Sequence, residues 1–219
     1  MLRAGDTDMF KPLLRWYLAL LPLAKGRTRL WYGQDRPGGV YGAWFIETMT
    51  QFGTFIPSEK GYHCPAVRDP AWPVWWAGNG CINLHREGSI ELLALALDYW
   101  DHTRDAAEFR TSILPLSVAV TDWVRTYFGR RNDTGLLDIW PTQSLEGYQA
   151  LFPPTRDNII ANDMPTVAGL HAVLPRLLVA GTETNVSAAQ LAKWQDLLKV
   201  LPPLPTANSK SCNCTVFTA

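Results

Sequence analysis

The sequence of 219 residues has no excess of charge of either sign and no long apolar run. Its 20 basic and 20 acidic side chains cancel, which argues against general binding to nucleic acids or to anionic membrane surfaces. The most apolar stretch near the start, about residues 13–23, contains Arg15 and Pro22 and is shorter than the roughly 20 residues that cross a bilayer. We therefore expect a globular chain with no nucleic-acid partner and no membrane partner.

Motifs of several common chemistries are also missing. The four cysteines lie at 64, 81, 212 and 214 and form no CxxC pair and no metal-ligand spacing. There is no phosphate-binding loop, dinucleotide fingerprint, zinc motif or GxSxG turn. We therefore expect no cofactor and no metal site.

The compartment is left open by the sequence. No signal peptide is recognisable, because no short apolar core is followed by a small-residue cleavage site. Three Asn-x-Ser/Thr sites, at Asn132, Asn185 and Asn213, favour a secretory or extracellular origin.

Tryptophan, in contrast, is abundant, with 10 residues. A tryptophan is a large flat surface with a polar edge, so this number predicts either a large aromatic core or a stacking site. Three of them, Trp72, Trp75 and Trp76, cluster in a proline-rich stretch over 54–80. This cluster predicts either the floor of a sugar subsite or an apolar plug that pins the loop.

Apolar residues recur with the helical period along most of the chain. The pattern predicts helices over about 7–24, 88–102 and 105–127 and a loop from 27 to 41. Residues 42–53 are either a short helix, which we favour, or an extended aromatic segment. Two further helices follow Asp163 and Ser187, which read as N-caps, as does Asp105. No convincing alternating strand is present. The sequence therefore predicts an all-α chain of helical hairpins.

Four blocks of this pattern resemble the six-hairpin glycosidases, which are (α/α)6 toroids and include the fucosidase-type enzymes. The blocks, in chain order, are residues 44–49 (WFIETM), 90–105 (IELLALALDYWDHTRD), 141–146 (PTQSLE) and 162–170 (NDMPTVAGL). Together the resemblance runs from about residue 8 to 205.

The resemblance implies an incomplete toroid, because a closed ring of twelve helices needs roughly 350 residues at ordinary helix lengths. We expect residues 1–205 to form a partial (α/α) toroid, with the missing remainder of the ring as a possible partner. Residues 206–219 are expected to be a disordered tail. A partial ring would leave apolar helix faces uncovered.

Glycoside hydrolysis needs two carboxyl groups that flank the bond. Glu146, which follows Trp140 at a loop-to-helix junction, matches by resemblance the loop that carries the general acid of the fucosidase-type enzymes. Aromatic neighbours would raise its pKa, as that role requires. A first-turn glutamate that caps the following helix is the structural alternative. Trp140 is then a candidate substrate-binding residue.

Other acids are candidate partners of Glu146. Glu47 lies in aromatic sequence and is either catalytic, a sugar ligand or the buried partner of an arginine. Asn83, His85 and Glu87 alternate, so they would share one side of an extended segment, and they resemble the segment that positions the base or water. Glu87 is equally a first-turn helix acid. Glu91, within an apolar helix, is a sugar ligand or a buried structural acid.

The catalytic base of the resembling family has no counterpart here. An aspartate precedes the glycine of the last block in those enzymes, whereas this chain has Ala168. The nearest acid is Asp163, which reads as a helix cap.

The sequence therefore predicts a glycoside hydrolase-like protein that acts on the O-glycosidic bonds of a polysaccharide or oligosaccharide. The alternatives are a non-catalytic carbohydrate-binding relative, an inactive fragment, and a polysaccharide lyase that uses Tyr62 or His63.

Overall fold

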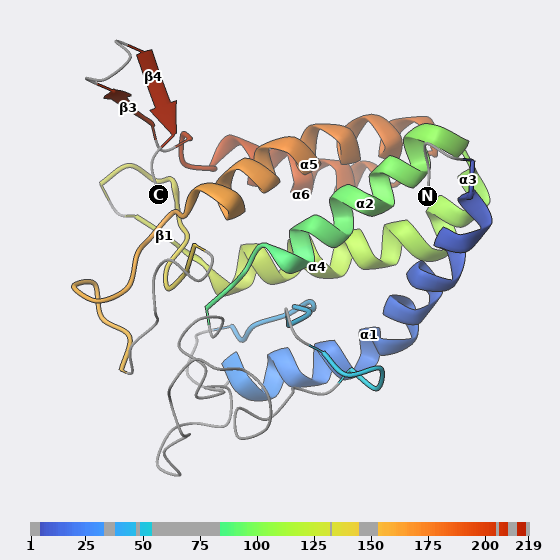
Figure 1. The fold of residues 1–219 in the computed structure, drawn as a ribbon, viewed down its shortest axis with the longest axis horizontal. Coiled ribbons are helices and arrows are strands. Elements are labelled where there is room, and N and C mark those ends of the chain that lie inside the picture. Colours follow the sequence, from blue (N-terminus) through green and yellow to red (C-terminus); the bar gives the residue numbers. More distant parts are fainter. Residues whose placement is uncertain are drawn as a thin grey trace.

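The computed structural model describes residues 5–32, 38–46, 49–53, 84–131, 133–144, 153–204, 206–209 and 214–217. These residues are mostly helical, which confirms the all-α prediction (Figure 1). A short 3-10 turn, Thr7–Met9, leads into α1 (Phe10–Tyr32). The other elements, in chain order, are α2 (Gly88–Thr103), α3 (Ala106–Glu108), a π-helical turn (Phe109–Ile113), α4 (Leu114–Tyr127), β1 (Gly129–Arg130), β2 (Leu137–Asp138), α5 (Met164–Glu183), α6 (Ala188–Lys199), β3 (Thr206–Ser209) and β4 (Cys214–Phe217).

The long helices form two rows of opposite direction. Helices α2 and α5 lie side by side and both run from the end marked by β1 to the end marked by α3 (Figure 1). Helices α1, α4 and α6 run the opposite way, with α4 against α1 and α6, and with α6 against α5. The N-terminal ends of α2 and α5 are therefore brought together at one end of the bundle.

The predicted helix starts are confirmed at three side-chain caps. The carboxylate of Asp105 accepts a hydrogen bond from the backbone N–H of Glu108 at 3.0 Å. Ser187 caps α6 through the N–H of Gln190 in the same way. Asp163, discussed below, caps α5. Each cap satisfies one of the backbone N–H groups that a helix start leaves without a partner.

Helix α1 extends to Tyr32, eight residues beyond the predicted end. The sequence at 25–29 is polar, but two of its polar groups are buried against the loop that follows. Arg27 donates from Nη2 to the carbonyl of Gly53 at 2.6 Å, and the Thr28 hydroxyl accepts from the N–H of Trp44 at 3.3 Å. The polar stretch thus remains helical because its side chains form hydrogen bonds with the backbone of the following loop. The predicted loop is therefore wrong for residues 27–32.

The favoured helix over 42–53 is also wrong, because residues 43–46 form no regular secondary structure and Ala43 is hydrogen-bonded to α4. The N–H of Ala43 donates to the carbonyl of Ala119 at 2.9 Å. Gly42 permits this approach: its φ is +89°, and a Cβ there would meet Ala119 O at 2.2 Å and Trp123 N at 2.4 Å. The periodicity of apolar residues along the sequence does not predict a close backbone contact of this kind.

Substitution of Gly42 tests this contact, and Gly38 provides a matched control. Both glycines have positive φ, but nothing lies within 4 Å of a Cβ at Gly38. We expect Gly38→Ala to lower the free energy of unfolding by about 1–2 kcal/mol, the cost of the left-handed backbone. Gly42→Ala should cost a further ~1–3 kcal/mol because its methyl group overlaps α4. Urea denaturation of both variants measures the difference, and equal losses would show that the loop does not touch α4.

The aromatic-core interpretation of the tryptophan content is confirmed for part of the set. Trp123 is fully buried and stacks on Trp44, with ring centroids 5.9 Å apart, and on Tyr127 at 5.1 Å. Trp194, also fully buried, donates from Nε1 to the hydroxyl of Thr121 at 3.0 Å and so joins α6 to α4. Trp72, Trp75 and Trp76 lie outside the described residues.

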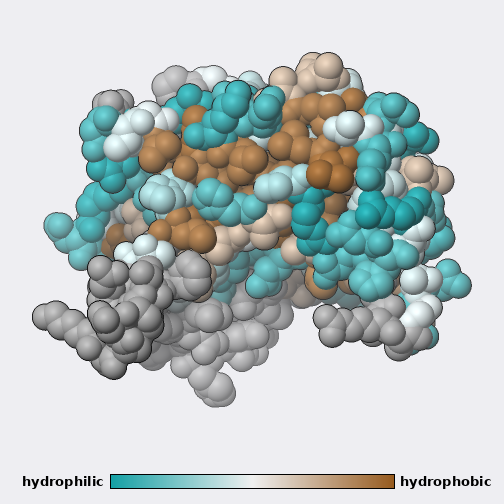
Figure 2. Space-filling view, turned by 90° about the horizontal axis from the view of Figure 1, so that it is seen from above, coloured by the Kyte–Doolittle hydropathy of each residue, from teal (hydrophilic) through white to brown (hydrophobic). Residues whose placement is uncertain are grey.

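Helix α5 is long and apolar enough to cross a membrane by length and composition. The central helices of water-soluble domains meet the same two criteria, and 44% of the most apolar stretch of α5 is buried against the rest of the chain. Part of the remainder is exposed, notably Val179, and Leu95 of α2 is exposed too. Figure 2 shows a brown, apolar area on the face of the molecule seen from above.

The C-terminal segment differs from the disordered tail that the sequence predicts. Strands β3 and β4 pair antiparallel, with Thr206 opposite Phe217 and Ser209 opposite Cys214. A second small pair, β1 with β2, closes the turn after α4. The prediction that the chain contains no strands is therefore wrong for these four short segments.

Candidate functional site

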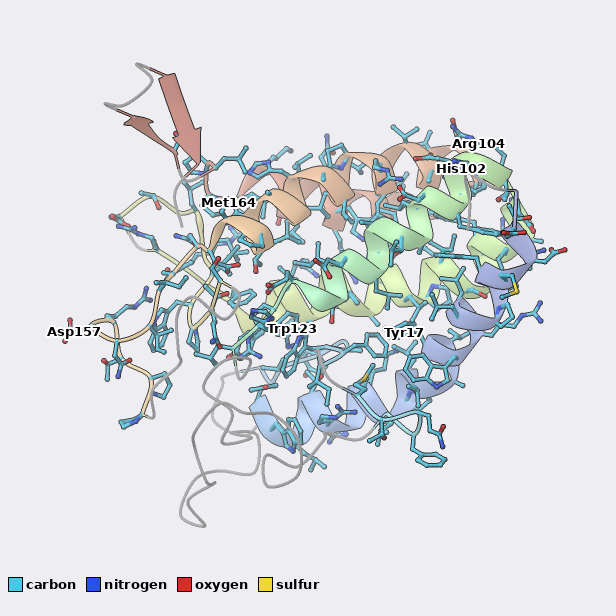
Figure 3. The ribbon with its side chains drawn as sticks, viewed as in Figure 1. Tyr17, His102, Arg104, Trp123, Asp157 and Met164 are labelled. Atoms are coloured by element: carbon cyan, nitrogen blue, oxygen red, sulfur yellow. The ribbon has the colours of Figure 1, made fainter. Side chains whose placement is uncertain are left out.

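A buried polar cluster lies where the N-terminal ends of α2 and α5 meet the segment 139–144. Three residues just before α2, His85, Arg86 and Glu87, contribute to it, as does Asp163 immediately before α5. Met164, labelled in Figure 3, marks the start of α5, and His102 and Arg104 mark the opposite end of the bundle. The cluster combines four titratable groups with the positive ends of two long helices.

His85 and Glu87 face the same side of the segment, as their alternation predicts. Nε2 of His85 lies 3.5 Å from Oε1 of Glu87, and both side chains are buried. The second oxygen of Glu87, Oε2, accepts a hydrogen bond from the backbone N–H of Arg86 at 2.9 Å. The carboxyl group of Glu87 thus has two neighbours, the imidazole of His85 and the backbone N–H of Arg86.

The environment of Glu87 favours its protonated form. Burial raises the pKa of Glu87 above its ordinary value, and the charge of Asp163 acts in the same direction. The nearby His85 and the hydrogen bonds from the backbone oppose the shift without reversing it. A carboxyl group of raised pKa is suited to donate a proton near neutral pH.

Asp163 is fully buried and serves as the N-cap of α5, as predicted. One carboxylate oxygen accepts from the hydroxyl of Thr142, and the other accepts from the N–H of Thr166 at 3.1 Å and from its hydroxyl at 2.8 Å. Burial raises the pKa of Asp163 despite these hydrogen bonds. Both oxygens are occupied by structural partners, so Asp163 is a poor candidate for the missing base.

The segment 139–144 joins the two helix starts. The side chain of Gln143 accepts a hydrogen bond from the N–H of Leu84 at 3.1 Å, and Asn162 accepts from the N–H of Ile139 at 2.9 Å. Trp140 and Pro141 are joined by a cis peptide bond. One face of the Trp140 ring is covered by the guanidinium group of Arg156, 4.5 Å from the ring centroid. A sugar could therefore stack only on the other face of Trp140.

Arg86 anchors the segment from the side opposite to His85 and Glu87. Its guanidinium group is completely buried and lies over the rings of Trp44, Tyr127 and Tyr32, at 4.5, 5.4 and 5.7 Å from their centroids. Within the described ranges no carboxylate pairs with it. Cation–π attraction of this kind stabilises a desolvated guanidinium, so the aromatic core fixes the backbone that carries His85 and Glu87.

Several predicted site residues lie outside the described residues: Glu146, Glu47, Asn83, Trp72, Trp75 and Trp76. Glu91 is described, but it is exposed and lines a separate pocket between α1 and α2. The structure thus brings together His85 and Glu87 of the predicted set and places Glu91 apart from them. In the part of the chain that is described, no three His, Cys, Asp or Glu side chains are grouped to hold a metal ion.

Residue-level reasoning missed Thr142, Gln143 and Arg86. Thr142 and Gln143 lie in the block 141–146, which was assigned to the site because of Glu146. The block was therefore identified correctly, but through a different residue. Arg86 falls on the other side of the alternating segment, and its partners come from α1, the 43–46 loop and α4. No local pattern indicates that cage.

Comparison of the sequence with protein-family models found no match, and comparison with curated proteins found none either.

Proposed function

We propose that this chain is a glycoside hydrolase-like protein that cleaves O-glycosidic bonds in a polysaccharide or oligosaccharide. The observation that carries the proposal is the buried Glu87, with a raised pKa, beside His85 at the meeting point of two helix N-termini. In this proposal Glu87 protonates the oxygen of the leaving group as the glycosidic bond breaks. A second carboxylate activates the water whose oxygen bonds to the anomeric carbon and takes up the proton that this water loses.

The fold belongs to the same proposal. The row of α2 and α5 would be part of the inner ring of an (α/α)6 toroid, and α1, α4 and α6 would be part of its outer ring. The common direction within each row supports this arrangement (Figure 1). The exposed apolar residue Val179 supports a ring that further helices complete.

The second carboxylate of the reaction is proposed from the sequence. Glu146 and Glu47 are the candidates, and Asp163 is excluded from the role by its three hydrogen bonds. In this proposal a sugar ring stacks on the face of Trp140 that Arg156 does not cover.

A non-catalytic carbohydrate-binding protein is the second candidate. Its supporting observation is that Asp163 is committed to capping α5 while Ala168 stands where the resembling enzymes have an aspartate. Such a protein would bind sugars through the same cluster without cleaving them.

One experiment separates these functions. The purified chain is incubated with a panel of plant and microbial polysaccharides, and new reducing ends and ultraviolet-absorbing unsaturated ends are measured together with binding. Reducing ends alone support hydrolysis. Unsaturated ends indicate a lyase, and binding without either product indicates the non-catalytic alternative.

A further inference from the structure

A pocket lies between α1 and α2. Its volume is about 180 Å³. The residues that line it are mostly apolar: Leu13 and Tyr17 of α1, Phe45 and Ile46 of the loop, and Gly88, Glu91, Leu92 and Leu95 of α2. Tyr17, labelled in Figure 3, lies between the two helices.

The aromatic wall of this pocket is held in place by specific contacts. The rings of Tyr17 and Phe45 meet edge to face, with centroids 5.1 Å apart, and Trp16 meets Tyr17 in the same manner at 4.7 Å. Phe45 is fixed to α2 because its N–H donates to the hydroxyl of Ser89 at 2.8 Å and its carbonyl accepts from that hydroxyl at 3.2 Å. The pocket is therefore preformed, as ligand pockets usually are.

The charge in the lining of the pocket is negative. Glu91 is the only charged residue in the lining, and in the described part of the chain no lysine, arginine or histidine forms an ion pair with it. Burial raises the pKa of Tyr17, so its phenol stays neutral. A ligand that enters this pocket thus meets one carboxylate, neutral aromatic rings and aliphatic walls.

We propose that this pocket binds a small organic ammonium ion whose apolar body is about the size of a six-membered ring. A cavity of about 150 Å³ accommodates benzene, so the volume fits such a body. The carboxylate of Glu91 pairs with the ammonium group at the pocket mouth, and the ring of Tyr17 attracts the cation. The proposal is independent of the glycosidase proposal and assigns Glu91 a different ligand from the sugar that the sequence suggests.

The test compares three probes of similar shape, benzylammonium, benzyl alcohol and benzoate, titrated into the full chain by NMR. We expect benzylammonium to bind about three- to tenfold more tightly than benzyl alcohol, which corresponds to one exposed ion pair with a cation–π contribution. Benzoate should bind least. Glu91→Gln should remove the preference for benzylammonium over benzyl alcohol, while Glu183→Gln, an exposed glutamate at the far end of the bundle, should preserve it.

A second variant separates loss of the pocket from loss of the charge. Leu95 is 46% exposed at the rim, so Leu95→Ala is expected to fold and to weaken both benzylammonium and benzyl alcohol equally. Equal affinity for the two probes in the unmodified chain, a preference that survives Glu91→Gln, or no binding of any probe would overturn the proposal.

Discussion

Replacement of Glu87 with glutamine is expected to lower kcat/KM for glycosidic cleavage by about 10²–10⁴-fold. Glutamine keeps the size of the side chain and can still accept the hydrogen bond from the N–H of Arg86, but it cannot donate a proton to a leaving oxygen. Sugar affinity should survive, because the shape of the cluster is unchanged. The rate is measured as release of reducing ends from whichever polysaccharide the panel identifies.

Glu108 offers a matched control for this variant. Glu87 and Glu108 are equally buried, at 7% exposure each, but Glu108 lies in α3 at the opposite end of the bundle and accepts a hydrogen bond from Ser112 (Figure 1). Glu108→Gln should retain most of the kcat/KM for glycosidic cleavage. If Glu87→Gln retains the same activity as Glu108→Gln, the carboxyl of Glu87 is not the proton donor.

Truncation of Trp123 to alanine should give the largest loss of stability, about 3–5 kcal/mol in the free energy of unfolding. Trp123 is fully buried and stacks on Trp44 and Tyr127, two of the three rings that enclose Arg86. Its removal therefore opens a cavity next to a buried guanidinium group. Urea denaturation of the variant gives the loss directly.

Two further substitutions make the Trp123 result specific. Leu30→Ala, on the exposed face of α1 at 65% exposure, should change stability by no more than about 0.5 kcal/mol. Trp123→Phe keeps one aromatic ring in the stack and should lose clearly less than the alanine variant. A loss below about 1 kcal/mol for Trp123→Ala would contradict the aromatic core described above.

The helices whose ends are set by neighbouring residues could be predicted from the sequence. Asp105, Asp163 and Ser187 each cap the helix that directly follows, so the signal and the structure lie within a few residues of each other. The helix ends and loops that depend on contacts with distant residues could not be predicted from the sequence. The loop after Gly42 depends on Ala119 of α4, more than 70 residues away, and α1 continues to Tyr32 because Arg27 binds the backbone at Gly53.

The same division applies to the candidate site. Alternation placed His85 and Glu87 on one side of their segment, and the distance of 3.5 Å between Nε2 of His85 and Oε1 of Glu87 confirms it. Thr142, which donates to the cap residue of a helix that begins about 20 residues later, has no local signal. Arg86 is anchored by rings from three separate segments, and such a cage exists only after the chain has folded.

The central claim is that the fold buries the Glu87 carboxyl in surroundings that favour its protonated form. The most direct test is the free energy of unfolding of Glu87→Gln relative to the unmodified chain, measured by urea denaturation from pH 3 to 8. Because the pKa of Glu87 is higher in the folded than in the unfolded protein, the folded protein binds more protons between its ordinary pKa of 4.5 and the folded pKa.

The stability of the unmodified chain should therefore fall, relative to the variant, as the pH rises from that value to the folded pKa. Glutamine does not titrate, so the advantage of Glu87→Gln is predicted to grow across this window and then to level off. A difference that moves the opposite way with pH would show that the fold lowers the pKa of Glu87. Glu87 would then be a structural carboxylate paired with His85, and the account would be contradicted.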